Sequence, residues 1–227
     1  MSNGNINEKK IEKLELIVVI MLGITAIATA WSTWQGSQHG GLTDQKFTMA
    51  NIIASEGNSE YNAGIQSLTQ DMLLYNEINS LQIDLHFAEN NGDMEEADKL
   101  EWKIDELIEG NMSEEMEAAF IWAGNESERL GENVSPFELE SFVDSYFEHA
   151  LELLAQSEEM LEDGNVNSTH SDHQGLVSVI YAVVLFLLGI SASFKGLREK
   201  YILLAASLIG FLGATIFMFT IPMVFPS

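Results

Sequence analysis

The segment from Leu16 to Trp34 constrains this chain most strongly, because it is largely apolar and has no charged residue in 19 positions. As a helix it would extend roughly 28 Å, close to the hydrocarbon thickness of a bilayer. A chain inside lipid must satisfy its own backbone hydrogen bonds, which a helix does. A lysine cluster in residues 1–15 precedes the segment, and a polar stretch follows it. The sequence therefore predicts a first transmembrane helix over residues 16–34.

Two further apolar segments lie near the other end of the chain, at residues 176–194 and 201–221. The short basic segment 195–200 separates them. Each apolar segment is long enough to cross a bilayer as a helix. The predicted fold class is therefore all-α: an integral membrane protein with three transmembrane helices and an acidic helical domain, residues 35–175, between the first two.

The distribution of Lys and Arg predicts how these helices are oriented. Of the ten basic residues, three lie in segment 1–15 and three in loop 195–200. Short basic segments beside a span stay in the cytoplasm. We therefore expect a multi-pass protein of the cell membrane, embedded in the lipid bilayer. Its N-terminus is then cytoplasmic, and segment 35–175 and the tail 222–227 are extracytoplasmic.

A cleaved signal peptide is an alternative interpretation of the first apolar segment. The lysines would form its basic region, and Ala28-Thr29-Ala30 resembles a cleavage site. The uncharged stretch, however, continues past this site to Trp31 and Trp34. Tryptophan is enriched where a span meets the membrane surface. We therefore favour an uncleaved helix with these two residues as interface anchors.

The central segment 35–175 is strongly acidic. It contains 31 of the 35 Asp and Glu but only four of the Lys and Arg. Such a surface repels nucleic acid and attracts cations. Either it is a solvated face adapted to a salty exterior, or it is a vestibule that concentrates cations. The absence of cysteine excludes disulfides, thiolate metal sites and cysteine nucleophiles.

Periodicity predicts several helices in the central segment. After a pause at Gly40-Gly41, a helix capped near Thr43 is expected to continue to about residue 89. A turn is expected at residues 89–93, which include Gly92. A shorter helix is expected over residues 94–108, with Ala97, Leu100, Ile104 and Leu107 or Ile108 facing inward. Another is expected over residues 113–124, capped by Ser113 and closed near Gly124. A long helix is expected from Pro136 to Asp163, because Ser135 and Glu138 form a capping box and Gly164 is a natural stop. In the first of these helices the apolar stripe includes Ile52, Ile53, Tyr61, Ile65, Leu68, Met72, Tyr75, Ile78, Leu81, Leu85 and Phe87.

Small and hydroxyl side chains share one face of the first span. Transmembrane helices associate through such residues, because lipid offers no hydrophobic drive for contact. The face is therefore either a packing seam within the protomer or the lining of a pore in an oligomer. It comprises Thr25, Thr29, Ser32, Thr33 and Gly36, opposite the bulky residues Ile20, Ile24, Ile27, Trp31 and Trp34. The other spans carry comparable packing residues at Gly189, Ser193, Ala206, Gly210 and Ala214, which favour a homo-oligomer.

One group of residues points to a metal or pH site at the outer membrane surface. His39 follows the first span, and His170, Asp172 and His173 precede the second. Imidazole and carboxylate groups bind divalent metals, and histidine changes charge near neutral pH. The alternative is that all four are ordinary polar residues beside the membrane. Apart from such a divalent metal, the sequence predicts no cofactor.

The residues Ala28-Thr29-Ala30-Trp31-Ser32-Thr33-Trp34-Gln35 resemble a motif of small prokaryotic membrane proteins. In that family an N-terminal span ends in Ala-Thr-x-x-Trp-Ser-x-aromatic-Gln. A helical extracytoplasmic segment and two C-terminal spans follow it. The family carries no assigned activity, so the resemblance implies a shared layout and a helix-packing or pore-mouth feature at the motif.

No catalytic motif is visible, and no span contains an ionisable residue that would serve proton or ion coupling. The chain is therefore expected not to be an enzyme. The leading hypothesis is a homo-oligomeric channel-like assembly whose acidic outer domain attracts cations. The alternatives are a membrane-anchored scaffold that binds a partner through its external helices, and a sensor of metal or pH.

Overall fold

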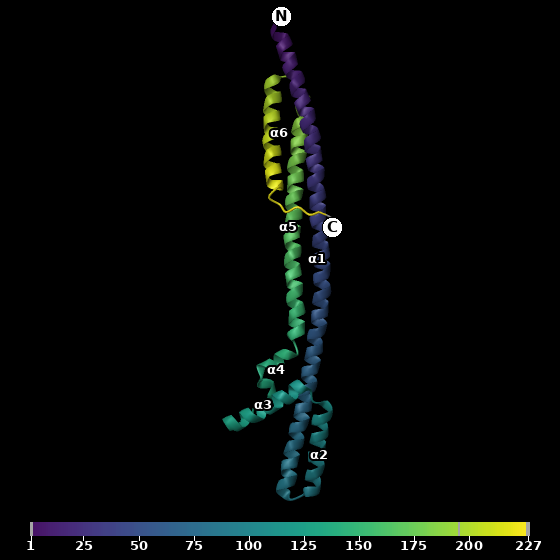
Figure 1. The fold of residues 1–227 in the computed structure, drawn as a ribbon, viewed down its shortest axis with the longest axis vertical. Coiled ribbons are helices and arrows are strands. Elements are labelled where there is room, and N and C mark those ends of the chain that lie inside the picture. The colour runs from purple at the N-terminus through teal and green to yellow at the C-terminus, as the bar shows by residue number, and fades with distance from the viewer. Residues whose placement is uncertain (1, 195, 226–227) are drawn as a thin grey trace. The chain divides into compact units, whose positions relative to one another are not determined.

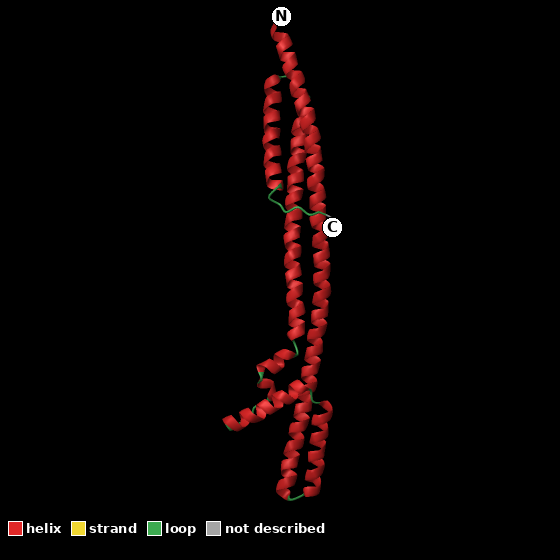
Figure 2. Cartoon of the chain, in the orientation of Figure 1, coloured by secondary structure: helices red, strands yellow, loops and turns green. Residues whose placement is uncertain are grey.

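The computed structural model describes residues 2–194 and 196–225, with side chains from Ile11 onward. Every regular element in these residues is a helix, as predicted (Figures 1 and 2). Three of the helices are long and apolar enough to cross a membrane, namely α1, α5 and α6. The elements are α1 (Ser2–Asn91), α2 (Met94–Asn111), α3 (Glu114–Leu130), the 3-10 turn η1 (Pro136–Glu138), α4 (Glu140–Ser145), α5 (Glu148–Ser191) and α6 (Leu197–Met218).

The chain divides into two compact units. The first, here called the spanning unit, comprises the chain up to Ala50 and from Glu159 onward. The second, the acidic unit, comprises Asn51–Glu158 and contains 26 Asp and Glu against three Lys and Arg. Helices α1 and α5 contribute residues to both units.

In the spanning unit, α1 and α5 run antiparallel with α6 beside them (Figure 1). Small residues recur every seven positions on the facing sides of α1 and α5. Ser171 Oγ donates a 2.9 Å hydrogen bond to the carbonyl of Gly36, and Thr43 Oγ1 lies 3.4 Å from the carbonyl of Gly164. Small side chains let two helix backbones approach closely. Within this unit the two series are Gly36, Thr43 and Ala50 on α1, and Gly164, Ser171 and Ser178 on α5.

The predicted pause at Gly40-Gly41 is wrong, because α1 continues through it without a break. Thr43 therefore does not cap a new helix. Its hydroxyl instead donates to the carbonyl of His39, 3.0 Å away. A methyl group at Gly40 would lie 3.6 Å from Ser171 Oγ, so this glycine lies against α5. Packing against a neighbouring helix here outweighs the weak helix propensity of glycine.

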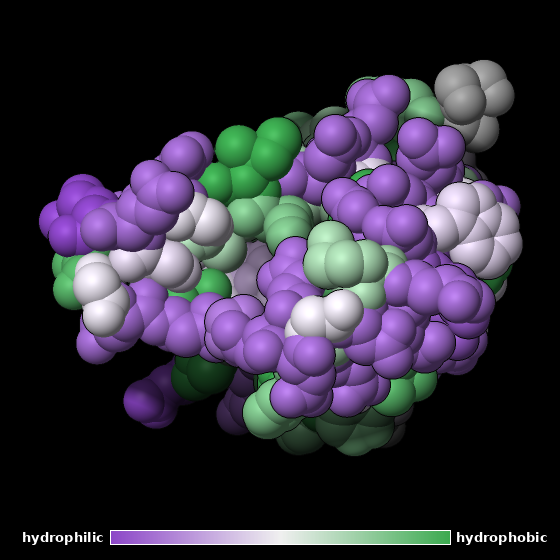
Figure 3. Space-filling view, turned by 90° about the horizontal axis from the view of Figure 1, so that it is seen from below, coloured by the Kyte–Doolittle hydropathy of each residue, from purple (hydrophilic) through white to green (hydrophobic). Residues whose placement is uncertain are grey.

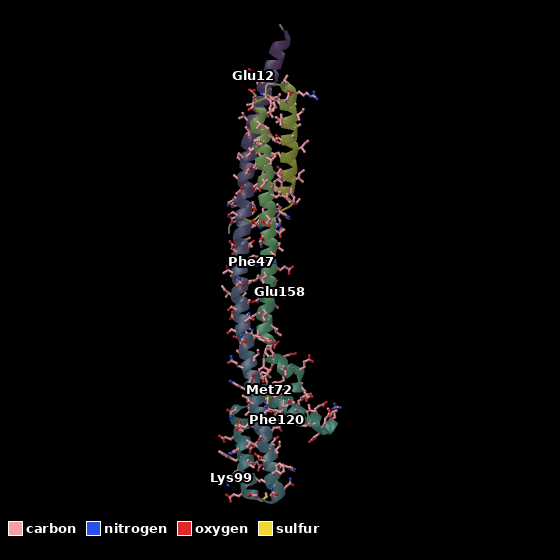
Figure 4. All side chains as sticks on the ribbon, turned by 180° about the vertical axis from the view of Figure 1, so that it is seen from behind. Glu12, Phe47, Met72, Lys99, Phe120 and Glu158 are labelled. Atoms are coloured by element: carbon pink, nitrogen blue, oxygen red, sulfur yellow. The ribbon has the colours of Figure 1, made fainter. Side chains whose placement is uncertain are left out.

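The predicted stop at Gly164 is also wrong. Helix α5 continues through this residue and ends at Ser191. Gly164 is buried, and a methyl group there would lie 2.5 Å from Cε1 of Phe47. Phe47 is labelled on α1 in Figure 4, where α5 lies beside it. The glycine therefore makes room for an aromatic ring and does not end a helix.

In the acidic unit, the end of α1 and α2 form a helical hairpin. Gly92 makes the turn with a φ of 74°, which suits glycine, and the Asp93 side chain caps α2. The inward face of α2 is as predicted, with Ala97, Leu100 and Ile104 buried. Residues of α1 complete this core, namely Ala88 with Leu81 and Leu85.

The predicted helix from Pro136 to Asp163 is divided in the structure. The capping box of Ser135 and Glu138 is present, but it begins only the three-residue turn η1. Two short interruptions then separate η1, α4 and α5. The chain bends here because its aromatic residues pack into a cluster with Met116 of α3, which is fully buried. This cluster includes Tyr75, Phe120, Phe137, Phe142 and Tyr146.

Helix α3 is longer than predicted, because Gly124 does not end it. The helix continues to Leu130, and Gly131 closes it with a φ of 73°. The Ser113 side chain caps its start, as expected from the sequence. The left-handed conformation that ends a helix needs glycine, so Gly131 supplies the stop.

The apolar stripe expected along the outer part of α1 is only partly right. Ile78 is fully buried, but Ile52 and Phe87 are 61% and 62% exposed. Besides Ile78, the buried positions between Ile52 and Phe87 are Gly57 and Gly64. A methyl group at Gly57 would lie 3.1 Å from Leu154, and one at Gly64 would collide with the carbonyl oxygen of Tyr146. The contact face of α1 is therefore made of small residues here.

Candidate functional site

Polar side chains converge where the predicted first span ends, and they connect α1 to α5. Ser32 is fully buried, and its hydroxyl lies 2.8 Å from both the main-chain and the side-chain oxygen of Gln174. One turn further along α1, a methyl group at Gly36 would lie 3.3 Å from Cβ of Gln174. The Ser and Gly of the Trp-Ser-Thr-Trp-Gln-Gly sequence thus hold α5 in a fixed position against α1.

The next motif residue, Gln35, holds the segment that follows α6. Its amide nitrogen donates to the carbonyl of Val224 at 2.9 Å, and its amide oxygen accepts from the main-chain nitrogen of Val224 at 2.9 Å. Gln35 therefore pairs with this residue as a neighbouring strand would. In Figure 1 the chain after α6 extends across α5 to α1. We call residues 219–225 the C-terminal tail.

His39, one turn beyond Gln35, also contacts the tail. Its Nε2 lies 2.9 Å from the carbonyl of Pro222, and its Nδ1 lies 3.1 Å from Oδ1 of Asn167 on α5. His39 is 1% exposed. The side chain thus joins three parts of the spanning unit: α1, α5 and the tail.

The structure brings only part of the predicted metal or pH group together. The rings of His39 and His170 are 5.2 Å apart, whereas His173 packs on Phe217 and Asp172 is exposed. Among the residues with described side chains, no three His, Cys, Asp or Glu are grouped to hold a metal ion. The geometry at His39 therefore supports the pH hypothesis better than the metal hypothesis.

His170 is held in an environment that disfavours its charged form. Burial lowers its pKa, and the nearby His39 and His173 lower it further. Its Nδ1 is buried and has no hydrogen-bond partner in the structure. A neutral imidazole with the proton on Nε2 fits this position, because Nδ1 then carries only a lone pair.

The small, hydroxyl-bearing face of the first span lies largely inside the protomer. Thr25 and Ser32 are fully buried, and Thr29 donates to the carbonyl of Thr25 at 2.7 Å. Thr33 is exposed, yet its hydroxyl lies 3.2 Å from that of Ser178 on α5. The opposite face behaves as expected for lipid contact, because Ile20, Ile24 and Ile27 are exposed. These positions support the packing interpretation of the face.

The predicted packing residues of the other two spans fall into two groups. Ala214 is 2% exposed, and a methyl group at Gly210 would lie 3.0 Å from Val184, so both lie against α5. Gly189, Ser193 and Ala206 are exposed on the protomer. Between α5 and α6, the Tyr181 hydroxyl lies 2.9 Å from that of Thr215, which itself donates to the carbonyl of Phe211.

The two tryptophans of the motif lie side by side. The ring centroids of Trp31 and Trp34 are 5.1 Å apart, and Trp31 lies 6.5 Å from Phe225 of the tail. Trp31 is 36% exposed. An aromatic group therefore covers the place where Gln35 holds the tail.

An ion pair fastens the opposite end of the spanning unit. Lys200 Nζ lies 2.6 Å from Oε1 of Glu15, and the Lys200 side chain is buried. This connects the start of α6 to α1. The sequence predicts that Lys200 lies in loop 195–200, but α6 begins at Leu197 and includes this residue.

The sequence did not predict the contacts that Gln174, Asn167 and the tail make with α1. Their partners Ser32, His39 and Gln35 are more than 100 positions away in the chain, so no local pattern marks these contacts. The seven-residue recurrence of small residues on α1 and α5 is a signal that could have located the helix contact. No protein-family model matches the chain, and neither a curated protein nor a solved structure is significantly similar to it.

Proposed function

We propose that this protein is a non-enzymatic membrane anchor whose acidic unit binds a basic partner protein outside the cytoplasm. One observation carries the proposal. Ser32, Gln35 and His39 of the spanning unit contact other parts of the same protomer. The acidic unit, in contrast, leaves most of its charged residues exposed, together with Tyr61, Phe87 and Trp102. The first feature suits an anchor, and the second suits recognition.

The orientation of the anchor follows from the basic residues. Segments 1–15 and 195–200 would be cytoplasmic, and the acidic unit and the tail would be extracytoplasmic. Because the chain contains no cysteine, single cysteines report on topology without background. A cysteine at Ser67 should react with a membrane-impermeant maleimide in intact cells, and one at Glu12 should react only after lysis. The reverse labelling pattern would refute this orientation.

The exposed surface of α2 is the best candidate for the partner contact. Trp102 is 64% exposed and lies between Glu101 and Lys103, in a helix with seven Asp and Glu against two Lys. Figure 3 shows one end of the molecule, where hydrophilic residues surround separate hydrophobic patches. Aromatic side chains in such surroundings are frequent anchors of protein interfaces, and surface charge speeds association with an oppositely charged partner.

Photo-crosslinking in native membranes tests this proposal. In a first variant a photoreactive residue replaces Trp102 in the acidic unit. In a second variant it replaces Ile24 on the exposed face of the first span. We expect the first to form a salt-sensitive adduct with another, basic protein, and that adduct to be lost when Glu101 and Asp105 are changed to Gln. Adducts only between copies of this chain would refute the proposal.

The channel hypothesis has less support from the geometry. Thr25 and Ser32, the central residues of the suggested lining, are fully buried within one protomer. Cation flux through liposomes that contain the purified protein is the direct test. Flux that is altered by Thr29→Leu, in an assembly of unchanged mass, would favour a channel over an anchor.

A further inference from the structure

His39 faces two hydrogen-bond acceptors at once. Its Nε2 lies 2.9 Å from the carbonyl oxygen of Pro222, which can only accept. Its Nδ1 lies 3.1 Å from Oδ1 of Asn167. A neutral imidazole has one N–H and one bare nitrogen, so it can donate to only one of these oxygens. The imidazolium form has two N–H groups and can donate to both.

The orientation of Asn167 is fixed by its other contact. Its Nδ2 donates to the carbonyl of Asp163 at 2.9 Å. Turning the amide over would place Oδ1 against that carbonyl, so that two acceptors faced each other. The oxygen of Asn167 therefore points to His39, and both ring nitrogens of His39 are required to donate.

We propose that His39 is a proton-binding site at the end of the first span, and that the bound proton locks the C-terminal tail onto α1 and α5. When the proton leaves, His39 keeps one N–H and loses either Pro222 or Asn167. Gln35 continues to hold Val224. The bond to Pro222 is then either lost or made by a neutral donor, so the tail is held less firmly.

The charged groups around His39 are few. On α5 its neighbours are His170 at 5.2 Å between ring centroids, then His173, with the exposed Asp172 between them in sequence. On α1 the next charged residues are Asp44 and Lys46, of which Lys46 pairs with Asp163 of α5 at 2.7 Å. The tail has no ionisable side chain in residues 219–225.

No carboxylate forms an ion pair with His39 among the residues that the structure describes. Two neutral oxygens therefore stabilise its charge, and the neighbouring His170 opposes it. Burial lowers the pKa of His170, and the nearby His39 and His173 lower it further. Binding of the tail is therefore stronger with the second proton on His39 than without it, because only the doubly protonated ring donates to both oxygens.

The protonation state can be measured directly. The full chain is labelled with ¹⁵N-histidine, placed in lipid nanodiscs, and examined by NMR between pH 5.5 and 8.5. Signals are assigned with single His→Gln variants at the five histidines. We expect His39 to show two protonated ring nitrogens at pH 6, while His170 shows one. A single protonated nitrogen on His39 at pH 6 would overturn the proposal.

The lock itself is tested with a spin label. Met223→Cys introduces the only thiol of the chain, so one nitroxide reports on the tail. We expect the ratio of mobile to immobile label to rise about tenfold between pH 6 and 8.5, as expected for the loss of one hydrogen bond from a charged donor. The rise should be absent in His39→Gln and present in the control His86→Gln.

A second variant separates the lock from simple loosening of the tail. Gln35→Ala should raise the mobile fraction at every pH and keep the pH step, because His39 is intact. A label whose mobility does not depend on pH in the unaltered background would refute the lock. The same pH step in His39→Gln would refute the assignment to His39.

Discussion

Gly164→Ala is the substitution whose effect follows most directly from the packing of α1 on α5. The new methyl carbon would lie 2.5 Å from Cε1 and 2.6 Å from Cδ1 of Phe47. Non-bonded carbon atoms prefer about 3.5–4.0 Å. The ring would therefore have to move by about 1 Å in a half-buried site.

Two opposing terms set the magnitude. Adding a methyl group to a packed contact typically costs about 1–3 kcal/mol, whereas replacing glycine by alanine inside a helix gains about 1 kcal/mol. Gly175, on the same helix, has no heavy atom within 4 Å of the corresponding position. Gly175→Ala should therefore show only the gain, and Gly164→Ala should be less stable than Gly175→Ala by about 1–3 kcal/mol.

The assay is amide hydrogen exchange of the full chain in nanodiscs, read on peptides that cover the middle of α5. We expect faster exchange around residue 164 in Gly164→Ala and slower exchange around residue 175 in Gly175→Ala. Adding Phe47→Leu to Gly164→Ala should restore protection, because the two positions are coupled by contact. Equal protection in the two glycine variants would refute the close packing.

Three further substitutions test other contacts. Gln35→Leu removes both hydrogen bonds to Val224, so the binding of the tail to α1 should weaken by about 1–3 kcal/mol. A spin label at residue 223 should then be more mobile at every pH, and a label that stays immobile would count against these hydrogen bonds. Glu15→Gln leaves the buried Lys200 ammonium without its carboxylate and should lower the melting temperature in detergent. Adding Lys200→Met should recover part of this loss, because the double variant has no unpaired buried charge. Ser113→Ala removes the cap of α3 and should cost about 1 kcal/mol, measured as faster exchange in its first turn, whereas the exposed Ser141→Ala should change nothing.

Local physics made part of this structure predictable. The caps at Ser113 and Ser135 depend on neighbours within three residues, and the turn at Gly92 follows from the same short range. The inward face of α2 follows from helical spacing alone. These features were predicted correctly because the residues that determine them are close together in the chain.

Predictions failed where a distant segment supplies the deciding contact. Gly40 and Gly164 have low helix propensity, and by themselves they suggest breaks. Each instead lies against the opposite helix, and at Gly164 the Phe47 ring leaves no room for a side chain. Likewise the capping box at Ser135 did not start a long helix, because an aromatic cluster with α3 bends the chain after η1.

The sequence predicted only part of the candidate site. The sequence pointed to His39 and to the Trp-Ser-Thr-Trp-Gln segment, since these follow directly after an apolar span. Their partners could not be inferred, because Gln35 and Val224 are 189 positions apart and His39 and Asn167 are 128 apart. The direction of each hydrogen bond, on which the proton-binding proposal rests, exists only once these partners are placed.

The sequence by itself determined that the chain is all-α, that three of its helices are apolar enough to cross a membrane, and that its charge lies between the first two. Those properties depend on the length of uncharged segments and on composition, which folding does not change. The tertiary structure decided that α1 continues unbroken through its glycines, that hydroxyls of the first span are enclosed within the protomer, and that His39 faces two acceptors. Each of these depends on which surfaces meet, and that is settled only when α1, α5 and the tail pack together.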